Sequence, residues 1–335
     1  MGRSNRLRVI TIGEVMLRLS VPHHQRFIQA DQFQVHYAGG EANVAVALAQ
    51  MGQEATHITC FPKNDLGLAA RNELVRWGVR TDQVYFDQGR MGVYFLENGA
   101  MQRASSIIYD RSDSAFALWD GRQLDWDWIL EGVDYFHWTG ITPAISQRAA
   151  DILKLGLQEA NRKGVQVTAD INYRKNLFDY GKTPKEVLSS LIPYVQVLVG
   201  GLSGIENATS IQANTFEEVC LKVKEQYPNI EAIADTTRTI VSSSINRLAG
   251  TLWDGEEFYY TKEYELTHIV DRIGGGDAFM AGLIYGLSHY EPQKAIEFAT
   301  VAGVLKHSIP GDALLCKVEE IEEVWTGNQV GKLKR

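Results

Sequence analysis

The chain has 335 residues, of which 45% are hydrophobic, enough to bury a sizeable core in one large domain or two ordinary ones. Its net charge of −8 leaves no basic surplus to neutralise phosphates, which argues against a nucleic-acid partner and means that an anionic substrate must be held by a few local arginines. The cysteines Cys60, Cys220 and Cys316 are far apart and odd in number, no apolar run reaches membrane-spanning length, and the first residues lack an apolar signal core, so we expect a cytoplasmic protein with free thiols and no membrane partner.

The first third of the chain alternates predicted strands and helices. Leu7 to Gly13 is a β-branched run typical of a core strand. The apolar spacing from Glu41 to Met51 predicts a helix, which Gly52 closes. A predicted strand from Thr56 to Phe61 and a predicted helix from Leu66 to Trp77 follow.

The same alternation continues to the end of the chain. Further short strand candidates are Val133 to Trp138, Val165 to Ala169, Tyr194 to Val199 and Ile230 to Ala234. The helix candidates are Ser146 to Arg162, Pro184 to Leu191, Phe216 to Tyr227, Ala278 to His289 and Pro292 to His307. This order implies right-handed βαβ units and a mostly parallel sheet covered by helices on both faces, that is, a three-layer α/β/α core.

Two stretches break the alternation. Arg18 to Tyr37 and Gly92 to Ile108 look like strands without helices, and the Asn-Gly of residues 97–100 predicts a hairpin between Met91 to Leu96 and Met101 to Ile107. A small β-sheet with its strands within about 14–37 and 91–108 would explain both; a β insertion without function is the alternative. We find no repeat or long linker, so we expect a single domain over 1–335 with a polar, frayed tail at 327–335.

The segment from Asp271 to Gly282, which reads DRIGGGDAFMAG, is the most informative one. Without side chains, the backbone of Gly274, Gly275 and Gly276 can turn its N–H groups toward one point, and the start of the helix adds unpaired N–H groups and the positive end of its dipole. Such a pocket suits a phosphoryl group in flight, and the Asp277 carboxylate beside it could take a proton from an attacking hydroxyl. The alternative is an ordinary helix with Asp277 as its N-cap.

This segment resembles the closing signature of the ribokinase-like (PfkB) carbohydrate kinases, and the resemblance extends over roughly residues 7 to 325. The run YAGGEANVAVALAQMG from Tyr37 to Gly52 looks like the family's N-terminal Gly-Gly-x-x-x-Asn motif. Three further segments, DINYR at 170–174, IIYDR at 107–111 and HSIPGD at 307–312, look like the branch that phosphorylates 2-keto-3-deoxygluconate. The resemblance implies a ribokinase-like fold and the cofactors ATP and Mg²⁺. It also implies a lid over the sugar, which makes a homo-oligomer through the lid one expected arrangement.

A keto-deoxy sugar acid needs arginine for its carboxylate and tyrosine or asparagine for its hydroxyls. Arg111 and Arg174 are the candidates for the first role, although Arg174 could equally be solvated or paired with Asp170. The resemblance and this chemistry together predict the following substrate-binding residues: Gly39, Gly40, Asn43, Tyr94, Tyr109, Arg111, Asn172 and Arg174. For Tyr94 the alternative is packing within the lid.

The nucleotide side follows from the resemblance alone. No P-loop occurs, and no Gly-x-Gly-x-x-Gly follows the first strand, which excludes these two nucleotide-binding motifs. The residues implied for ATP are Thr236, Thr237, Arg238, Gly274, Gly276, Ala302 and His307. For the last two, an apolar helix face in the core is a strong alternative.

One departure from the family pattern concerns magnesium. The family usually carries Asn-x-x-Glu after the strand that ends near Val199, but Gly201 and Gly204 stand at these positions. Magnesium could still be held by the nucleotide and water. The expected function is therefore ATP-dependent phosphorylation of 2-keto-3-deoxygluconate, with a fructokinase-like ketose kinase or a catalytically impaired sugar-binding protein as alternatives.

Overall fold

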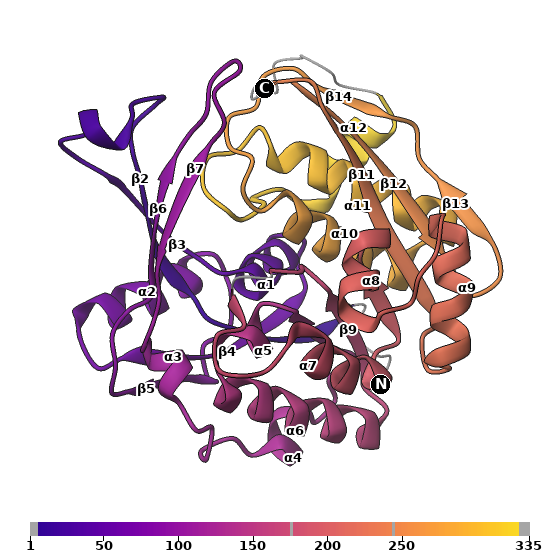
Figure 1. Ribbon diagram of the computed structural model, residues 1–335, viewed down its shortest axis with the longest axis horizontal. Coiled ribbons are helices and arrows are strands. Elements are labelled where there is room, and N and C mark those ends of the chain that lie inside the picture. The colour runs from indigo at the N-terminus through magenta and orange to yellow at the C-terminus, as the bar shows by residue number, and fades with distance from the viewer. Residues whose placement is uncertain (1–5, 175–176, 243–244, 328–335) are drawn as a thin grey trace.

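A ten-stranded sheet forms the centre of the computed structural model, which describes residues 6–174, 177–242 and 245–327 (Figure 1). The strand order is β13-β12-β11-β10-β9-β8-β1-β4-β5, with β14 paired to β12. The strands are β1 (Arg8–Ile12), β4 (Glu54–Pro62), β5 (Val84–Asp87), β8 (Tyr135–Thr139), β9 (Gln166–Asp170), β10 (Val197–Val199), β11 (Ala232–Ile240), β12 (Asn246–Trp253), β13 (Phe258–Tyr260) and β14 (Tyr264–Leu266). Pairing is parallel from β5 through to β11 and antiparallel around β12, so the mostly parallel α/β sheet is confirmed.

Helices cover both faces of this sheet, because its parallel strands alternate their side chains between two apolar clusters. Ile10 and Ile12 of β1 face one cluster, whereas Val9 faces the other. The first cluster is closed by α3 (Ala115–Leu118), α4 (Trp126–Ile129), α5 (Thr142–Ile145), α6 (Gln147–Lys163), α7 (Pro184–Leu191), α8 (Leu202–Thr209) and α9 (Phe216–Gln226). The second is closed by α1 (Gly40–Gln50), α2 (Asp65–Arg76), α10 (Gly275–His289), α11 (Pro292–Lys306) and α12 (Val318–Trp325).

A second sheet of four strands stands at one side of the molecule, in the order β3-β2-β6-β7 (Figure 1). It consists of β2 (Met16–Ser20), β3 (Gln34–Ala38), β6 (Val93–Glu97) and β7 (Ser106–Asp110), and we call it the lid sheet. Pairing is antiparallel except between β2 and β6, which are parallel. That this sheet takes part in an oligomer stays a prediction.

The predicted hairpin in the lid sheet is wrong in one respect. Its second strand begins at Ser106 rather than at Met101. The reason is a local turn, in which the N–H groups of Ala100 and Arg103 each donate to the carbonyl of the other residue, at 3.1 and 2.9 Å. These backbone groups are therefore not available to extend the ladder with β6.

The other predicted elements agree with the structure to within a few residues, with two notable exceptions. β11 runs on to Ile240, and α10 begins at Gly275 instead of Ala278. The antiparallel strands β12 to β14 were not predicted. Within the described residues no helix has both the length and the apolar character that a membrane span requires. Most of the predicted frayed tail, 328–335, lies outside the described residues.

Candidate active site

The glycine run at 274–276 forms the N-terminus of α10, and each glycine meets a different constraint. Gly274 is the N-cap and has φ of 83°, a left-handed conformation that favours glycine. A Cβ on Gly275 would lie 2.7 Å from Cε1 of His307, whereas a Cβ on Gly276 would have no heavy atom within 4 Å. The first N–H groups of α10 have no acceptor within the helix, and Gly276 is exposed with no atom near its Cβ position, so an anion could approach this end of the helix.

Asp277 lies in the first turn of α10, and its side chain is nearly buried at the wall of the cavity described below. Because Gly274 is the N-cap, the structure does not use Asp277 in that role. The side-chain amide of Asn43 donates to Asp277 Oδ2 at 2.7 Å. Burial raises the pKa of Asp277 to about 8, and the Asn43 hydrogen bond opposes this shift. A carboxylate with a pKa near neutrality suits a general base.

The motif around Gly39 and Gly40 places Asn43 in reach of Asp277. A Cβ on Gly39 would collide with the carbonyl of Glu14, and one on Gly40 would lie 3.6 Å from Asp277 Oδ1. The adjacent Glu41, fully buried, accepts hydrogen bonds from Thr139 at the C-terminal end of β8 and from Thr142 at the start of α5. This contact fixes the start of α1 against the central sheet, so Asn43 and Asp277 meet across two helices.

These groups line a cavity of about 400 Å³ at the carboxyl ends of the parallel strands, where ligands bind in open α/β sheets. Of the sequence-predicted residues, the cavity brings together Gly39, Gly40, Asn43, Tyr94, Tyr109, Asn172, Arg174, Arg238, Gly274, Gly275, Gly276 and Asp277. The structure adds to the lining Asp170, Arg272, Asp312, Met16, Ala38, Ile107, Ile141 and Ile273.

The segment after β9 presents polar groups to one side of the cavity. Asn172 has φ of 33°, a sparsely populated conformation for a residue with a side chain, and its N–H donates to Asp170 Oδ1 at 3.0 Å. Burial raises the pKa of Asp170 to about 6. Arg174 is exposed at the cavity, and among the described residues its guanidinium forms no ion pair. Its charge nevertheless acts on Asp170, whose pKa it lowers against the larger effect of burial, so an electrostatic contact with Asp170 stays an alternative.

A buried ionic cluster, which the sequence did not reveal, connects the lid sheet to the glycine run. Arg18 of β2 is 1% exposed and donates to Asp271 Oδ2 at 2.6 Å and to Asp312 Oδ1. Burial alone opposes its charge, but the carboxylates of Asp312 and Asp271 raise the pKa of Arg18. The hydroxyl of Tyr94 also donates to Asp312, and the N–H of Gly311 donates to Asp271. The hydroxyl that Tyr94 was predicted to offer to the sugar is thus already engaged.

Arg111 is not where the sequence suggested. Its guanidinium pairs with Glu14, with Nε at 2.9 Å from Oε2, and it is not among the residues that line the cavity. Because Glu14 is nearly buried, the pair is mainly a contact between the crossover after β1 and the end of β7.

Four residues predicted for the nucleotide also lie outside the cavity lining. Thr236 and Thr237 pair along β11 with β12, and Ala302 is buried between α10 and α11. His307 lies beneath Gly275, with Nδ1 at 2.7 Å from the Gly303 carbonyl, and burial lowers its pKa to about 4. For Ala302 and His307 the structure supports the core alternative. Their predicted role stays a prediction.

The glycines at 201 and 204 lie at the start of α8, next to a carboxylate. A Cβ on Gly201 would lie 2.7 Å from Oδ2 of Asp235, whose pKa burial raises to about 6. The described residues include no group of three or more His, Cys, Asp or Glu side chains that could hold a metal ion. This donor set fits magnesium held mainly by nucleotide phosphates and water, with one or two carboxylates at most.

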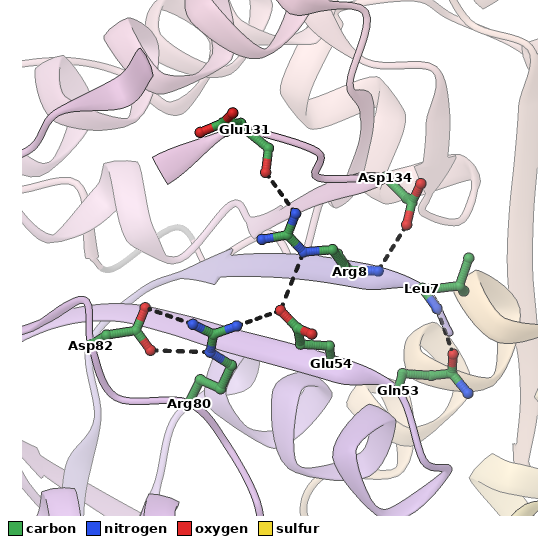
Figure 2. Close-up of polar contacts among 8 residues, drawn as sticks. All are labelled: Leu7, Arg8, Gln53, Glu54, Arg80, Asp82, Glu131 and Asp134. Atoms are coloured by element: carbon green, nitrogen blue, oxygen red, sulfur yellow. Dashed lines mark hydrogen bonds and ion pairs between the residues drawn. The ribbon is translucent and has the colours of Figure 1, made fainter. Parts of the chain in front are cut away.

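A second cavity of about 480 Å³ opens at the opposite end of the parallel strands, and Figure 2 shows its polar groups. Arg8 and Arg80 converge on Glu54, and Arg80 also pairs with Asp82 at 3.2 Å. Arg8 further donates to the Glu131 carbonyl at 2.8 Å. All of these arginines are paired with acceptors of the protein itself. The cluster therefore connects β1 and β4 at their amino ends and offers little unpaired charge to a ligand.

Comparisons with known proteins identify the family of the chain. Residues 6–316 match the model of the pfkB family carbohydrate kinases. A 2-dehydro-3-deoxygalactonokinase from Haloferax volcanii is 30% identical over 96% of this chain and 98% of its own length. The structure of a 2-dehydro-3-deoxygluconokinase from Thermotoga maritima is 40% identical, with a TM-score of 0.91 over 96% of this chain and all of that one. A putative ribokinase II from E. coli, in complex with ATP and Mg²⁺, shares the fold, with a TM-score of 0.81 at 18% identity over 96% of this chain and all of that one.

Proposed function

The chain belongs to the pfkB family of carbohydrate kinases and is thus a phosphotransferase that acts on a sugar hydroxyl, and we propose that its substrate is 2-keto-3-deoxygluconate. The product would be 2-keto-3-deoxy-6-phosphogluconate, formed by transfer of the γ-phosphoryl group of ATP to the terminal hydroxyl. The similarity to 2-dehydro-3-deoxy sugar kinases supports the class of substrate. Because one of these relatives takes the galacto epimer by name, the test below includes both epimers.

The observation that carries the proposal is that Arg174 and Asp277 line the same cavity. Arg174 has no carboxylate partner among the described residues and can bind the carboxylate of a sugar acid. A neutral ketose offers no charge to balance this guanidinium. Arg111 gives no support to a sugar-acid substrate, because its charge is already paired with that of Glu14.

In the proposed reaction Asp277 accepts the proton of the attacking hydroxyl. Asn43 orients its carboxylate and favours its charged form, against the burial that favours the neutral one. The N–H groups of Gly275, Gly276 and Asp277 stabilise the charge on the transferring phosphoryl group. Magnesium bound with the nucleotide would supply further positive charge, and Asp170 and Asp235 are the nearby carboxylates that could orient its water shell.

The absence of Asn-x-x-Glu at Gly201 and Gly204 keeps a second candidate, a sugar-binding protein with impaired turnover. It differs from the first candidate in rate and not in sugar affinity. The free, buried thiols of Cys60 and Cys220 and the use of ATP support the cytoplasm as the place where the protein acts.

The test is a coupled assay of ADP release with both epimers of the sugar acid and with neutral ketoses such as fructose. Arg174→Met should lower kcat/KM for the sugar acids by the equivalent of about 2–5 kcal/mol, because the substrate carboxylate loses its partner. It should leave any ketose activity unchanged. Arg122→Met, a change at an exposed arginine paired with Asp120, is the matched control.

Arg111→Met tests whether an arginine near the site acts on stability or on the choice of substrate. It leaves nearly buried Glu14 without a partner, so it should lower the melting temperature and reduce activity on all sugars alike. Fructose turnover above that of the sugar acids, or equal losses on both classes in Arg174→Met, would refute the sugar-acid proposal. Tight binding of the sugar acid without turnover would favour the second candidate.

A further inference from the structure

Two arginines meet in the cavity at a single acceptor. Arg238 comes from β11, and Arg272 stands two residues before Gly274. Between them lies the fully buried side chain of Asn246 at the start of β12. With its amide nitrogen donating to the Ile245 carbonyl at 2.9 Å, the amide oxygen accepts from Arg272 Nη2 at 3.0 Å and from Arg238 Nη2 at 2.9 Å. One neutral oxygen therefore holds two positive groups side by side.

These guanidiniums lack the counter-ions that other arginines of the chain have. Arg18 has two carboxylate partners and Arg111 has one, but in the described part of the chain Arg238 and Arg272 form no ion pair. The Nε of Arg272 is also buried without any hydrogen-bond partner among those residues. Burial lowers the pKa of both arginines, and for Arg238 the charge of Arg272 adds to the effect. Arg238 is exposed and Arg272 half-buried, so water solvates part of this charge, but two like charges held side by side still favour the binding of an anion.

The position of Arg238 and Arg272 in the cavity indicates which anion would bind between them. Both arginines line the cavity that contains Gly276 and Asp277, so an anion between them would lie near the start of α10. In Figure 1 the lid sheet stands at the left and β11 and β12 at the right, with α10 between them. Tyr109 of β7, in the lid sheet, and Arg238 of β11 both line the cavity. The sugar acid carries one negative charge, for which Arg174 is in place, whereas a nucleoside triphosphate carries several. The chain's net charge of −8 repels such a polyanion, so local positive charge is required.

We propose that Arg272 and Arg238 form a two-guanidinium seat for the phosphate chain of the nucleotide, and that Asn246 is the positioning residue that spaces them. The inference rests on the proposed function for the identity of the phosphate donor. It gives Arg272 a role that neither the sequence motif nor the similarity to relatives assigns. It also gives the chain a source of charge neutralisation that does not depend on residues at 201 and 204.

The experiment measures binding by calorimetry without turnover, in the full chain, for ATP, AMP, sodium tripolyphosphate and 2-keto-3-deoxygluconate. Arg272→Gln should weaken ATP and tripolyphosphate about 10- to 100-fold, as expected for the loss of a hydrogen bond between charged groups. AMP and the sugar acid should bind as before. Because the change removes one of two unpaired like charges, the melting temperature of the ligand-free protein should stay the same or rise. The control Arg247→Gln, at an exposed arginine of β12, should change none of these values.

Three results would overturn the inference. The first is an equal loss of affinity for AMP and ATP, and the second is a loss confined to the sugar acid, which would assign the pair to the substrate carboxylate. The third is a lower melting temperature with unchanged ATP affinity, which would make the pair structural. If the wild type and Arg272→Gln bind ATP with equal affinity, the phosphate-binding role of the two arginines is refuted, but the proposed function is not. Wild-type protein that binds no ATP refutes the proposed function as well.

Discussion

Replacing Asp277 with asparagine should make the protein almost inactive and more stable. The amide has nearly the size of the carboxylate, and its Oδ1 can still accept the 2.7 Å hydrogen bond from Asn43. Loss of the general base should lower kcat by about 10²- to 10⁴-fold with little change in sugar affinity. The gain in stability has a different origin, namely the burial of a carboxyl group that would be charged in water.

The pH dependence of that gain follows from the pKa of Asp277, about 8 in the folded protein against an ordinary 3.8. Between these two values the folded protein holds a proton that the unfolded chain has released. The wild type therefore loses stability as pH rises from about 4 to 8, at a rate approaching 1.4 kcal/mol per pH unit from this group. The stability of Asp277→Asn does not fall in this way. The difference in free energy of unfolding between the variant and the wild type should therefore grow by about 3 kcal/mol between pH 5 and pH 7. In the wild type, kcat/KM should rise with pH toward an apparent pKa near 8, because only the carboxylate accepts a proton.

The assay compares urea denaturation and melting temperature of the two proteins from pH 5 to pH 9, beside steady-state kinetics. Other carboxyl groups with raised pKa, such as Asp170, are present in both proteins and largely cancel in the difference. A stability difference that does not vary with pH would refute the argument from burial. Near-normal kcat in the variant would refute the assignment of Asp277 as the base.

Two further predictions concern the surroundings of the site. Arg18→Met should destabilise the protein by about 3–5 kcal/mol in urea denaturation, because two buried carboxylates lose their partner; a change below about 1 kcal/mol would contradict that account. Gly204→Glu should be tolerated, since its Cβ would lie 3.7 Å from Ile171, whereas Gly201→Asn should be destabilising by about 1–3 kcal/mol because it displaces Asp235. If either change lowers the magnesium concentration needed for half-maximal rate, Gly204→Glu should be the one, and an improvement by Gly201→Asn alone would contradict this steric reasoning.

The sequence was most informative where function works through the backbone. The run from Gly274 to Asp277 could be interpreted because other segments of the chain resemble the same kinase family; alone, it would also suit an ordinary capped helix. The structure places these residues with Asn43 in one cavity. Helices such as α7 were predicted well because their signals are local. Thr183 and Glu186 form a capping box there, and Pro184 is the first helical residue.

The sequence was least informative where a partner is distant along the chain. Arg111 has the residue type that a carboxylate requires, but Glu14, 97 positions earlier, takes up its charge. No local pattern encodes that contact, which arises when the crossover after β1 meets the end of β7. The strand β12 escaped prediction for a related reason. Its central Gly250 weakens the strand pattern, but a Cβ there would collide with Oγ1 of Thr300 on α11, so glycine permits the close approach of that helix.

The ion pairs of Arg18 have a mechanical consequence for the lid sheet. Because they fix β2 to the segments before and after the two closing helices, the base of the lid cannot swing as a rigid flap without separating buried charges. At the outer ends, Arg26 and Arg103 pair with Glu97 within the lid, and Ile28 and Met101 are 87% and 75% exposed. Opening should therefore be a bending motion whose amplitude increases toward the tips. The entrance can then widen for a sugar while the N–H groups of the glycine run keep their positions.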